Sequence, residues 1–287
     1  MIKRTLNILV LLTLSLLPIV SKAQFSCGEA INSCRIKVSS TTHGVAMLNN
    51  LDTYLSGYNY RGVGYHYNHE NFRDAMFGKH KLKYQTLFSG IVGATELYDS
   101  KQYSLMLKQS WSAYQPFKVG ERLQLLAGAQ MQLAGGALYI PTNGNNLVSA
   151  KMRATLAASA MAIYRIPAKK GNYTLRAQLD IPLIGAMFAP EFGQSYYEIF
   201  GLGHNKNTIV LSHPANSPSM RAMLSADIPV ALHKWSSTIR LTYIADIFQS
   251  DVHDTRTHIY NHSFAVGFVK TIYKVKNNDK LKQYSPF

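Results

Sequence analysis

The feature that most constrains this chain is an alternation of apolar and polar residues with a period of two. Over residues 121–134, every odd position from 123 onward is apolar, and the even positions are polar or glycine except Leu126 and Ala134. A similar alternation recurs over 152–164, 173–181 and 239–247. Because successive side chains of a strand point to opposite faces, each segment is predicted to be a β-strand with one apolar face. The chain is therefore expected to be all-β.

The length of these segments indicates a membrane protein. They extend over roughly 15–19 residues, whereas strands of soluble proteins usually have about 5–6. A tilted strand crosses the hydrocarbon of a bilayer with about 9–11 residues, and only closed barrels satisfy the backbone of strands in lipid. Beyond the N-terminal segment, no stretch approaches the ~18 apolar residues of a helical span. We therefore predict a transmembrane antiparallel up-and-down β-barrel.

Turn signals divide the chain into strands. Ten are expected, near 36–47, 58–73, 80–97, 101–116, 121–140, 149–167, 172–189, 217–231, 235–250 and 255–274. The long connection 190–216 could hold a further hairpin, formed by 195–202 and 208–212, which would make twelve strands. The predicted barrel thus has 10–12 strands, with short periplasmic turns and longer outer loops.

The N-terminus carries the pattern of an export signal. Lys3 and Arg4 precede an apolar run over 8–20, and small residues follow at positions 21 and 23. This pattern predicts a signal peptide over 1–23 and an exported mature protein. Together with the barrel, it predicts location in the outer membrane of a Gram-negative bacterium.

The remaining chain is divided into three parts. Residues 24–57 form an N-terminal segment that could be a first strand, a plug or a periplasmic arm. Residues 58–274 form the barrel, and 275–287 a basic periplasmic tail. Because disulfides persist after export, Cys27 and Cys34 are expected to close a short local loop rather than to bind metal.

The charge composition excludes some partners. Lys and Arg number 30 against 15 Asp and Glu, but only 16% of residues are charged, and the basic ones are scattered. Scattered basic residues on an exported chain do not indicate a nucleic-acid partner. The expected partners are outer-membrane lipids and either an anionic solute or an envelope protein.

Charged side chains recur on the face opposite the apolar one and are therefore expected inside the barrel. They are Lys83, Lys108, Arg153, Arg165, Arg176, Asp180, Arg221, Asp227, Arg240 and Asp246, together with Glu70. Because buried charges need partners, the favoured interpretation is an internal ion-pair network. The alternative is an arginine-lined pore or cavity for anionic solutes.

Aromatic residues are expected to form the girdles at the two membrane interfaces. The candidates near segment ends are Tyr65, Tyr67, Tyr84, Tyr103, Trp111, Tyr139, Tyr164, Tyr173 and Tyr243.

Two short segments resemble a known family. Residues 50–56 (Asn-Leu-Asp-Thr-Tyr-Leu-Ser) and 60–64 (Tyr-Arg-Gly-Val-Gly) are similar to the opening of an uncharacterised family of outer-membrane barrel proteins, carried as a domain of unknown function. The resemblance implies the barrel fold and the outer-membrane location, and it brings no catalytic residues.

No catalytic motif is present: the chain lacks GxSxG, HExxH, P-loop and dinucleotide-binding patterns. We therefore expect a non-enzymatic barrel without cofactor or metal: a narrow porin, a solute or lipid binder, or a component of envelope assembly. One alternative is a lipid-modifying hydrolase. It would need a Ser, Thr or Asp within hydrogen-bond reach of His66, His258 or His262 at the lipid interface. Another alternative is a soluble exported β-protein.

Overall fold

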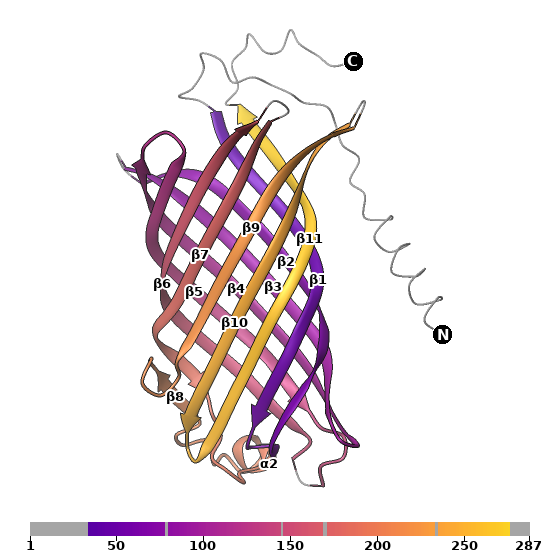
Figure 1. Ribbon diagram of the computed structural model, residues 1–287. Coiled ribbons are helices and arrows are strands. Elements are labelled where there is room, and N and C mark those ends of the chain that lie inside the picture. The colour runs from indigo at the N-terminus through magenta and orange to yellow at the C-terminus, as the bar shows by residue number, and fades with distance from the viewer. Residues whose placement is uncertain (1–33, 78–79, 145, 169–170, 233–234, 276–287) are drawn as a thin grey trace.

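The computed structural model describes residues 34–77, 80–144, 146–168, 171–232 and 235–275, and shows a closed β-barrel of ten long, strongly tilted strands (Figure 1). The ten strands are β1 (Cys34–Asp52), β2 (Ser56–Phe77), β3 (His80–Leu97), β4 (Ser100–Val119), β5 (Leu123–Tyr139), β6 (Val148–Ala168), β7 (Gly171–Phe188), β9 (Ser219–Leu232), β10 (Trp235–Val252) and β11 (Thr255–Val275). The prediction of a transmembrane up-and-down barrel is confirmed.

The barrel closes where the first and last strands meet. β1 pairs antiparallel with β11 along its whole length and with β2 on its other side. β6 pairs with β7, and β7 pairs with β9 over residues 174–180, which completes the ring. Residues 34–52 of the N-terminal segment are thus a barrel strand, and the barrel begins before residue 58. Cys27, the signal peptide and the tail beyond residue 275 lie outside the described residues.

The two ends of the barrel differ, as Figure 1 shows. At the turn end, β2 passes to β3, β4 to β5, β6 to β7 and β9 to β10 through short connections. At the loop end, the longest connection links β7 to β9 and contains the helix α2 (Tyr196–Phe200) and the short strand β8 (Ile209–Ser212). β8 pairs with the last residues of β7.

The predicted extra hairpin in this connection is wrong. Residues 195–202 contain helix α2, because Ser195 and Glu198 form a capping box: the Ser195 side chain accepts from the Glu198 backbone N–H, and the Glu198 side chain accepts from the Ser195 N–H. Only the second half of the predicted hairpin is a strand, β8. The barrel therefore has ten strands and not twelve.

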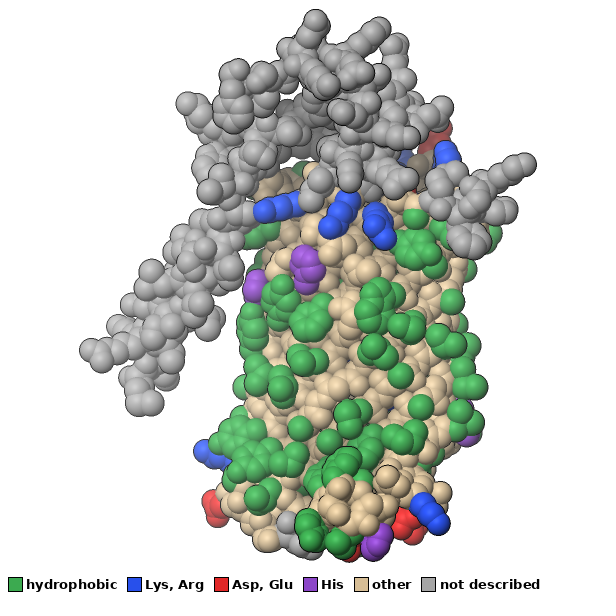
Figure 2. Space-filling view, turned by 180° about the vertical axis from the view of Figure 1, so that it is seen from behind, with side chains coloured by type: hydrophobic (Ala, Val, Ile, Leu, Met, Phe, Trp, Pro, Cys, Tyr) green, Lys and Arg blue, Asp and Glu red, His purple; other side chains and the backbone are tan. Residues whose placement is uncertain are grey.

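The wall has an apolar outer face and a polar inner face. On β4, Leu105, Leu107 and Trp111 are exposed on the outside, whereas the intervening Lys108 and Ser110 are buried inside. Figure 2 shows hydrophobic side chains over the wall and charged ones gathered at the two ends. This is the arrangement of a barrel that spans a lipid bilayer. Among the described residues, no helix has the length and apolar character needed to cross a membrane.

Apolar side chains also fill parts of the interior. A cluster of Phe72, Tyr114, Leu126, Met161 and Ile163 lies toward the turn end. Another cluster lies toward the loop end; its buried members are Tyr54, Leu55, Tyr60, Leu138, Ile140, Phe248 and Ile259.

Between these clusters, Leu48 packs against Ile91 and Ala46. It lies over two paired glycines, Gly64 and Gly93, where a Cβ on Gly93 would stand 2.5 Å from the Leu48 side chain. The interior thus depends on glycine at this crossing.

The aromatic residues follow the predicted girdles only in part. Tyr84, Tyr103, Tyr139, Tyr164 and Tyr173 lie near strand ends, and the Tyr103 and Tyr139 rings stack at 6.3 Å. By contrast, Tyr65, Tyr67, Trp111 and Tyr243 lie well inside their strands, so their placement near segment ends was wrong.

The outward position of Met131, in the middle of β5, provides a test of the membrane placement. Met131→Arg should destabilise the barrel by about 2–4 kcal/mol, because the cation would face hydrocarbon. Leu125→Arg, near the turn end of the same strand, should cost about 0–1 kcal/mol. Urea unfolding of protein refolded in lipid vesicles, followed by tryptophan fluorescence, measures both, and equal costs would contradict the assignment.

Candidate functional site

The interior of the barrel collects almost all the charged residues predicted to line it. Their side chains, Lys83, Lys108, Arg153, Arg176, Asp180, Arg221, Asp227, Arg240 and Asp246, point inward and are buried or half-buried. Arg165 is the exception: it has the inward parity but is exposed, because it lies near the turn end of β6, where the lumen ends.

Glu70 on β2 is the centre of the ion-pair network. Its carboxylate accepts from Arg176 Nη2 at 2.7 Å and from Arg240 Nη1, and it also accepts from Gln85 Nε2 at 2.5 Å. The Glu70 side chain is only 2% exposed. These bonds join β2 to β7, β10 and β3 across the lumen.

Arg240 extends the network to β9. Its guanidinium forms two parallel bonds with Asp227, from Nε to Oδ1 at 2.5 Å and from Nη2 to Oδ2 at 2.7 Å. This bidentate geometry is the strong form of an Arg–carboxylate pair. Arg240 therefore neutralises parts of two carboxylates from different strands.

Neutral polar groups surround the ion pairs. The Gln85 amide donates to Gln178 Oε1 at 2.8 Å, and the Tyr114 hydroxyl donates to Gln85 Oε1 at 2.9 Å. Asp180 accepts from the Ser159 hydroxyl at 2.5 Å and from Gln178. Asp180 is thus held by neutral donors, although Arg176 lies four residues away on the same face.

A second group of polar side chains lies closer to the loop end of the lumen than Glu70 does. Lys108 forms an ion pair with Asp246, and Arg221 Nη2 donates to Asn68 Oδ1 at 3.2 Å. His66 Nε2 lies 2.7 Å from the Ser89 hydroxyl. All of these groups face the lumen.

Within the described barrel, none of the three candidate histidines, His66, His258 and His262, bonds a Ser, Thr or Asp side chain on the lipid-facing wall. The His66–Ser89 pair lies in the barrel interior, away from lipid. His262 faces outward, but its hydrogen-bond partner is the Tyr243 hydroxyl at 2.8 Å. His258 Nε2 is buried without a partner in the described part of the chain. Across the same residues, no group of three His, Cys, Asp or Glu side chains is arranged to hold a metal.

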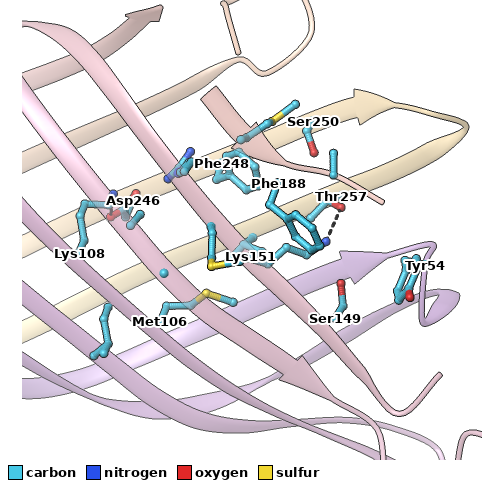
Figure 3. A pocket seen from close by; sticks show the side chains of 18 of the residues that line it. Tyr54, Met106, Lys108, Ser149, Lys151, Phe188, Asp246, Phe248, Ser250 and Thr257 are labelled. Atoms are coloured by element: carbon cyan, nitrogen blue, oxygen red, sulfur yellow. Dashed lines mark hydrogen bonds and ion pairs between the residues drawn. The ribbon is translucent and has the colours of Figure 1, made fainter. Parts of the chain in front are cut away.

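A cavity of about 80 Å³, measured as space open to the centres of water molecules, lies in the loop-end half of the lumen (Figure 3). Its apolar lining includes Met106, Phe188 and Phe248. Three cations, Lys108, Lys151 and Arg153, also line it.

Two of these cations have partners of their own. Lys108 is paired with Asp246. Lys151 is paired with Asp52 at 2.8 Å and bonded to Thr257 Oγ1 at 3.1 Å, the bond drawn in Figure 3. Asp52 and Lys151 were not among the predicted residues, although Lys151 shares the parity of Arg153 on β6.

Arg153 is different. Its guanidinium stacks over the Phe248 ring at 4.0 Å, and Nη1 donates to Ser219 Oγ at 3.2 Å. Within the described ranges, no carboxylate lies within 4.0 Å of it. Asp246, whose charge acts on Arg153, is already paired with Lys108. Arg153 therefore brings to the cavity wall a positive charge without an ion-pair partner of its own.

The connection from β7 to β9 folds over the cavity. Phe188, Ala189 and Pro190 line the cavity, and the Phe188 ring stacks on Tyr196 of α2 at 6.3 Å. The Tyr54 hydroxyl donates to the Gln194 carbonyl at 2.6 Å. Burial raises the pKa of Tyr54 and of Tyr196 above the ordinary value of a phenol.

A family model described as "Protein of unknown function (DUF3316)" matches residues 7–279. The chain belongs to this family. The match confirms the resemblance seen in residues 50–56 and 60–64, and it extends over nearly the whole chain. No curated protein matches the sequence.

Several solved structures are similar. The transport unit of the autotransporter AIDA-I from Escherichia coli has 10% identity and a TM-score of 0.43, over 88% of this chain and 93% of that one. Ail, the attachment invasion locus protein of Yersinia pestis, has 12% identity and a TM-score of 0.31, over 82% and 99%. The translocator domain of NalP from Neisseria meningitidis has 8% identity and a TM-score of 0.38, over 82% and 88%. At these values the similarities carry no conclusion about the role of this chain.

The importance of Glu70 can be measured as stability. Glu70→Gln keeps the shape but leaves Arg176 buried without its carboxylate, which should destabilise the barrel by about 3–5 kcal/mol. The control is Arg256→Gln, which breaks the exposed pair with Asp251 and should cost less than about 1 kcal/mol. Urea unfolding in vesicles gives both values, and a small effect at Glu70 would show that the network does not hold the strands together.

Proposed function

We propose that the protein is a non-enzymatic outer-membrane barrel that holds a small amphipathic anion in the cavity beneath its outer loops, and that it does not act as an open pore. The observation that carries this proposal is that Arg153 lies in a largely apolar cavity without an ion-pair partner of its own among the described residues. A buried charge is costly unless a partner neutralises it. The anionic group of a ligand supplies such a partner.

The cavity lining supports an amphipathic ligand. Arg153 and Lys151 lie on neighbouring inward positions of β6, and the Phe188, Phe248 and Met106 side chains offer an apolar surface beside them. A water molecule needs about 10–15 Å³ in this measure, so the cavity admits several waters or a small organic anion. A short-chain carboxylate fits this chemistry, with its carboxylate at Arg153 and its chain against the aromatic rings.

The location and orientation belong to the same proposal. The apolar outer wall and the export pattern of residues 1–23 support the outer membrane of a Gram-negative bacterium. Short turns usually face the periplasm and long loops the outside. The cavity then lies under the outer surface, where a ligand reaches it from the medium through the loops.

Binding can be tested with hexanoate on the purified full-length protein in detergent, by isothermal titration calorimetry. Arg153→Met should weaken hexanoate binding at least tenfold, because the anion loses its charged partner. The matched control is Arg165→Met, on the same strand but exposed at the turn end, which should leave binding unchanged.

Ligand controls separate charge from apolar contact. Hexanol should bind more weakly than hexanoate, and hexylammonium should not bind, because it repels Arg153 and Lys151. Absence of hexanoate binding to the wild type, or equal binding by the Arg153 variant, would overturn the proposed function.

Because the lumen is closed, we expect the protein not to conduct ions across a bilayer. Tyr114 is fully buried and Glu70 nearly so, and together with Phe72 they fill the turn-end half of the barrel. The wild-type protein should show no steady conductance steps in planar bilayers, whereas Phe72→Ala combined with Tyr114→Ala should introduce small ones. Porin-like steps in the wild type would contradict a closed barrel.

A further inference from the structure

Three cations face outward on neighbouring strands where the apolar wall meets the turn end of the barrel. They are Lys37 on β1, Arg73 on β2 and Lys270 on β11, and all three are exposed. We name them the β11–β1–β2 basic cluster. Figure 2 shows basic side chains gathered at this end of the wall.

The register of the sheet brings the three cations together. Lys37 lies directly opposite Arg73. Ser39, the next outward residue of β1, lies directly opposite Lys270. Opposite residues of an antiparallel pair have Cβ atoms about 4.5–5.5 Å apart, and diagonal neighbours are about 7–8 Å apart. The three long side chains are therefore within reach of a single anionic group above Ser39.

The positive charge of the cluster is not neutralised by the protein. In the part of the chain that the structure describes, no carboxylate lies within 4.0 Å of its basic groups. Asp74 follows Arg73 along β2, but it belongs to the opposite face of the strand and forms an ion pair with Lys83 at 2.5 Å. Like charges directly opposite in a sheet are destabilising, so a bound anion would remove a cost that Lys37 and Arg73 impose.

Exposed cations at the loop end are arranged differently. Arg61 on β2 and Lys101 on β4 both lie directly opposite Glu96 on β3. Arg256 forms an ion pair with Asp251 at 3.1 Å. Each of these cations has an acidic neighbour, so the loop end offers no group of three cations comparable to the basic cluster.

The cluster lies at the boundary of the apolar zone. On β11, the outward residues from Phe264 to Phe268 are apolar and exposed, and Lys270 is the next outward residue. In a barrel that spans a bilayer, lipid headgroups lie at the edge of the apolar band. The layer that covers these cations is therefore the headgroup layer of the membrane.

We propose that the β11–β1–β2 basic cluster binds the phosphate group of an acidic phospholipid. Basic groups at a membrane surface attract anionic lipids, whereas the ammonium group of a zwitterionic lipid is repelled by the same cations. The Ser39 hydroxyl, between Lys37 and Lys270, is a further hydrogen-bond donor for a phosphate oxygen. The proposal rests on the position of the barrel in a bilayer and not on the ligand of the cavity.

The test is competition between two lipids, measured by native mass spectrometry of the full-length protein in detergent. With equimolar phosphatidylglycerol and phosphatidylcholine of the same acyl chains, the wild type should carry the acidic lipid at least fivefold more often. The triple variant Lys37→Gln, Arg73→Gln and Lys270→Gln should lower this ratio below twofold, because glutamine keeps a polar side chain but removes the charge.

The matched control is the triple variant Arg61→Gln, Lys101→Gln and Arg256→Gln, which removes three cations from the loop end and should keep the wild-type ratio. All six side chains are exposed, so the barrels should fold, which heat-dependent gel mobility checks. Lys270→Gln alone should lower the ratio at least twofold, and it decides the test if the triple variant does not fold.

Glycerol phosphate, which has the phosphate without acyl chains, should not displace phosphatidylglycerol at equal concentration. Displacement by glycerol phosphate would indicate a site for a soluble phosphate and overturn the assignment to a lipid. A wild-type ratio near one, an unchanged ratio in the cluster variants, or an equal loss in the loop-end control would also overturn the proposal.

Discussion

The structure depends on one constraint: a backbone that crosses lipid must satisfy all its hydrogen bonds within the protein. β1 meets this constraint by pairing along its full length with β11, the last strand of the barrel. Closure in turn fixes the two faces of every strand, because alternate side chains must point to hydrocarbon or to the lumen. The alternation of apolar and polar residues in the sequence reflects these two faces. It places the polar groups of the interior sites in the lumen.

The same closure confines many polar side chains to a narrow interior. Charges there have little access to water, so they are stable only when paired. Glu70 forms ion pairs with two arginines, and Arg240 forms ion pairs with two carboxylates. The pairs run between strands that are distant along the chain: Glu70 and Arg176 are 106 residues apart. Each bond across the lumen therefore also fixes the shape of the ring.

The sequence predicts which face a residue occupies, but it does not predict its partner. Parity placed Arg176, Asp180 and Glu70 inside, yet the partner of Arg176 is Glu70, because register and curvature decide which strands face each other. Parity also says nothing about depth, and so it could not show that Arg165 lies beyond the lumen. The length of the 190–216 connection left room for a hairpin of 195–202 with 208–212, whereas the local capping bonds of Ser195 favour a helix. The cavity is lined by residues of seven strands, β3 to β7, β10 and β11, and no local sequence pattern predicts that combination.

One rule connects the inside of the barrel with its outside. A chain in a membrane satisfies its own polar groups wherever it can, as Glu70 inside and His69 outside both illustrate. A polar or charged group that is left without a partner is costly, because neither the packed lumen nor the hydrocarbon supplies the missing hydrogen bond or opposite charge. Inside, Arg153 is one such group, and it borders the cavity. The interior therefore favours a small anion as the missing partner of Arg153.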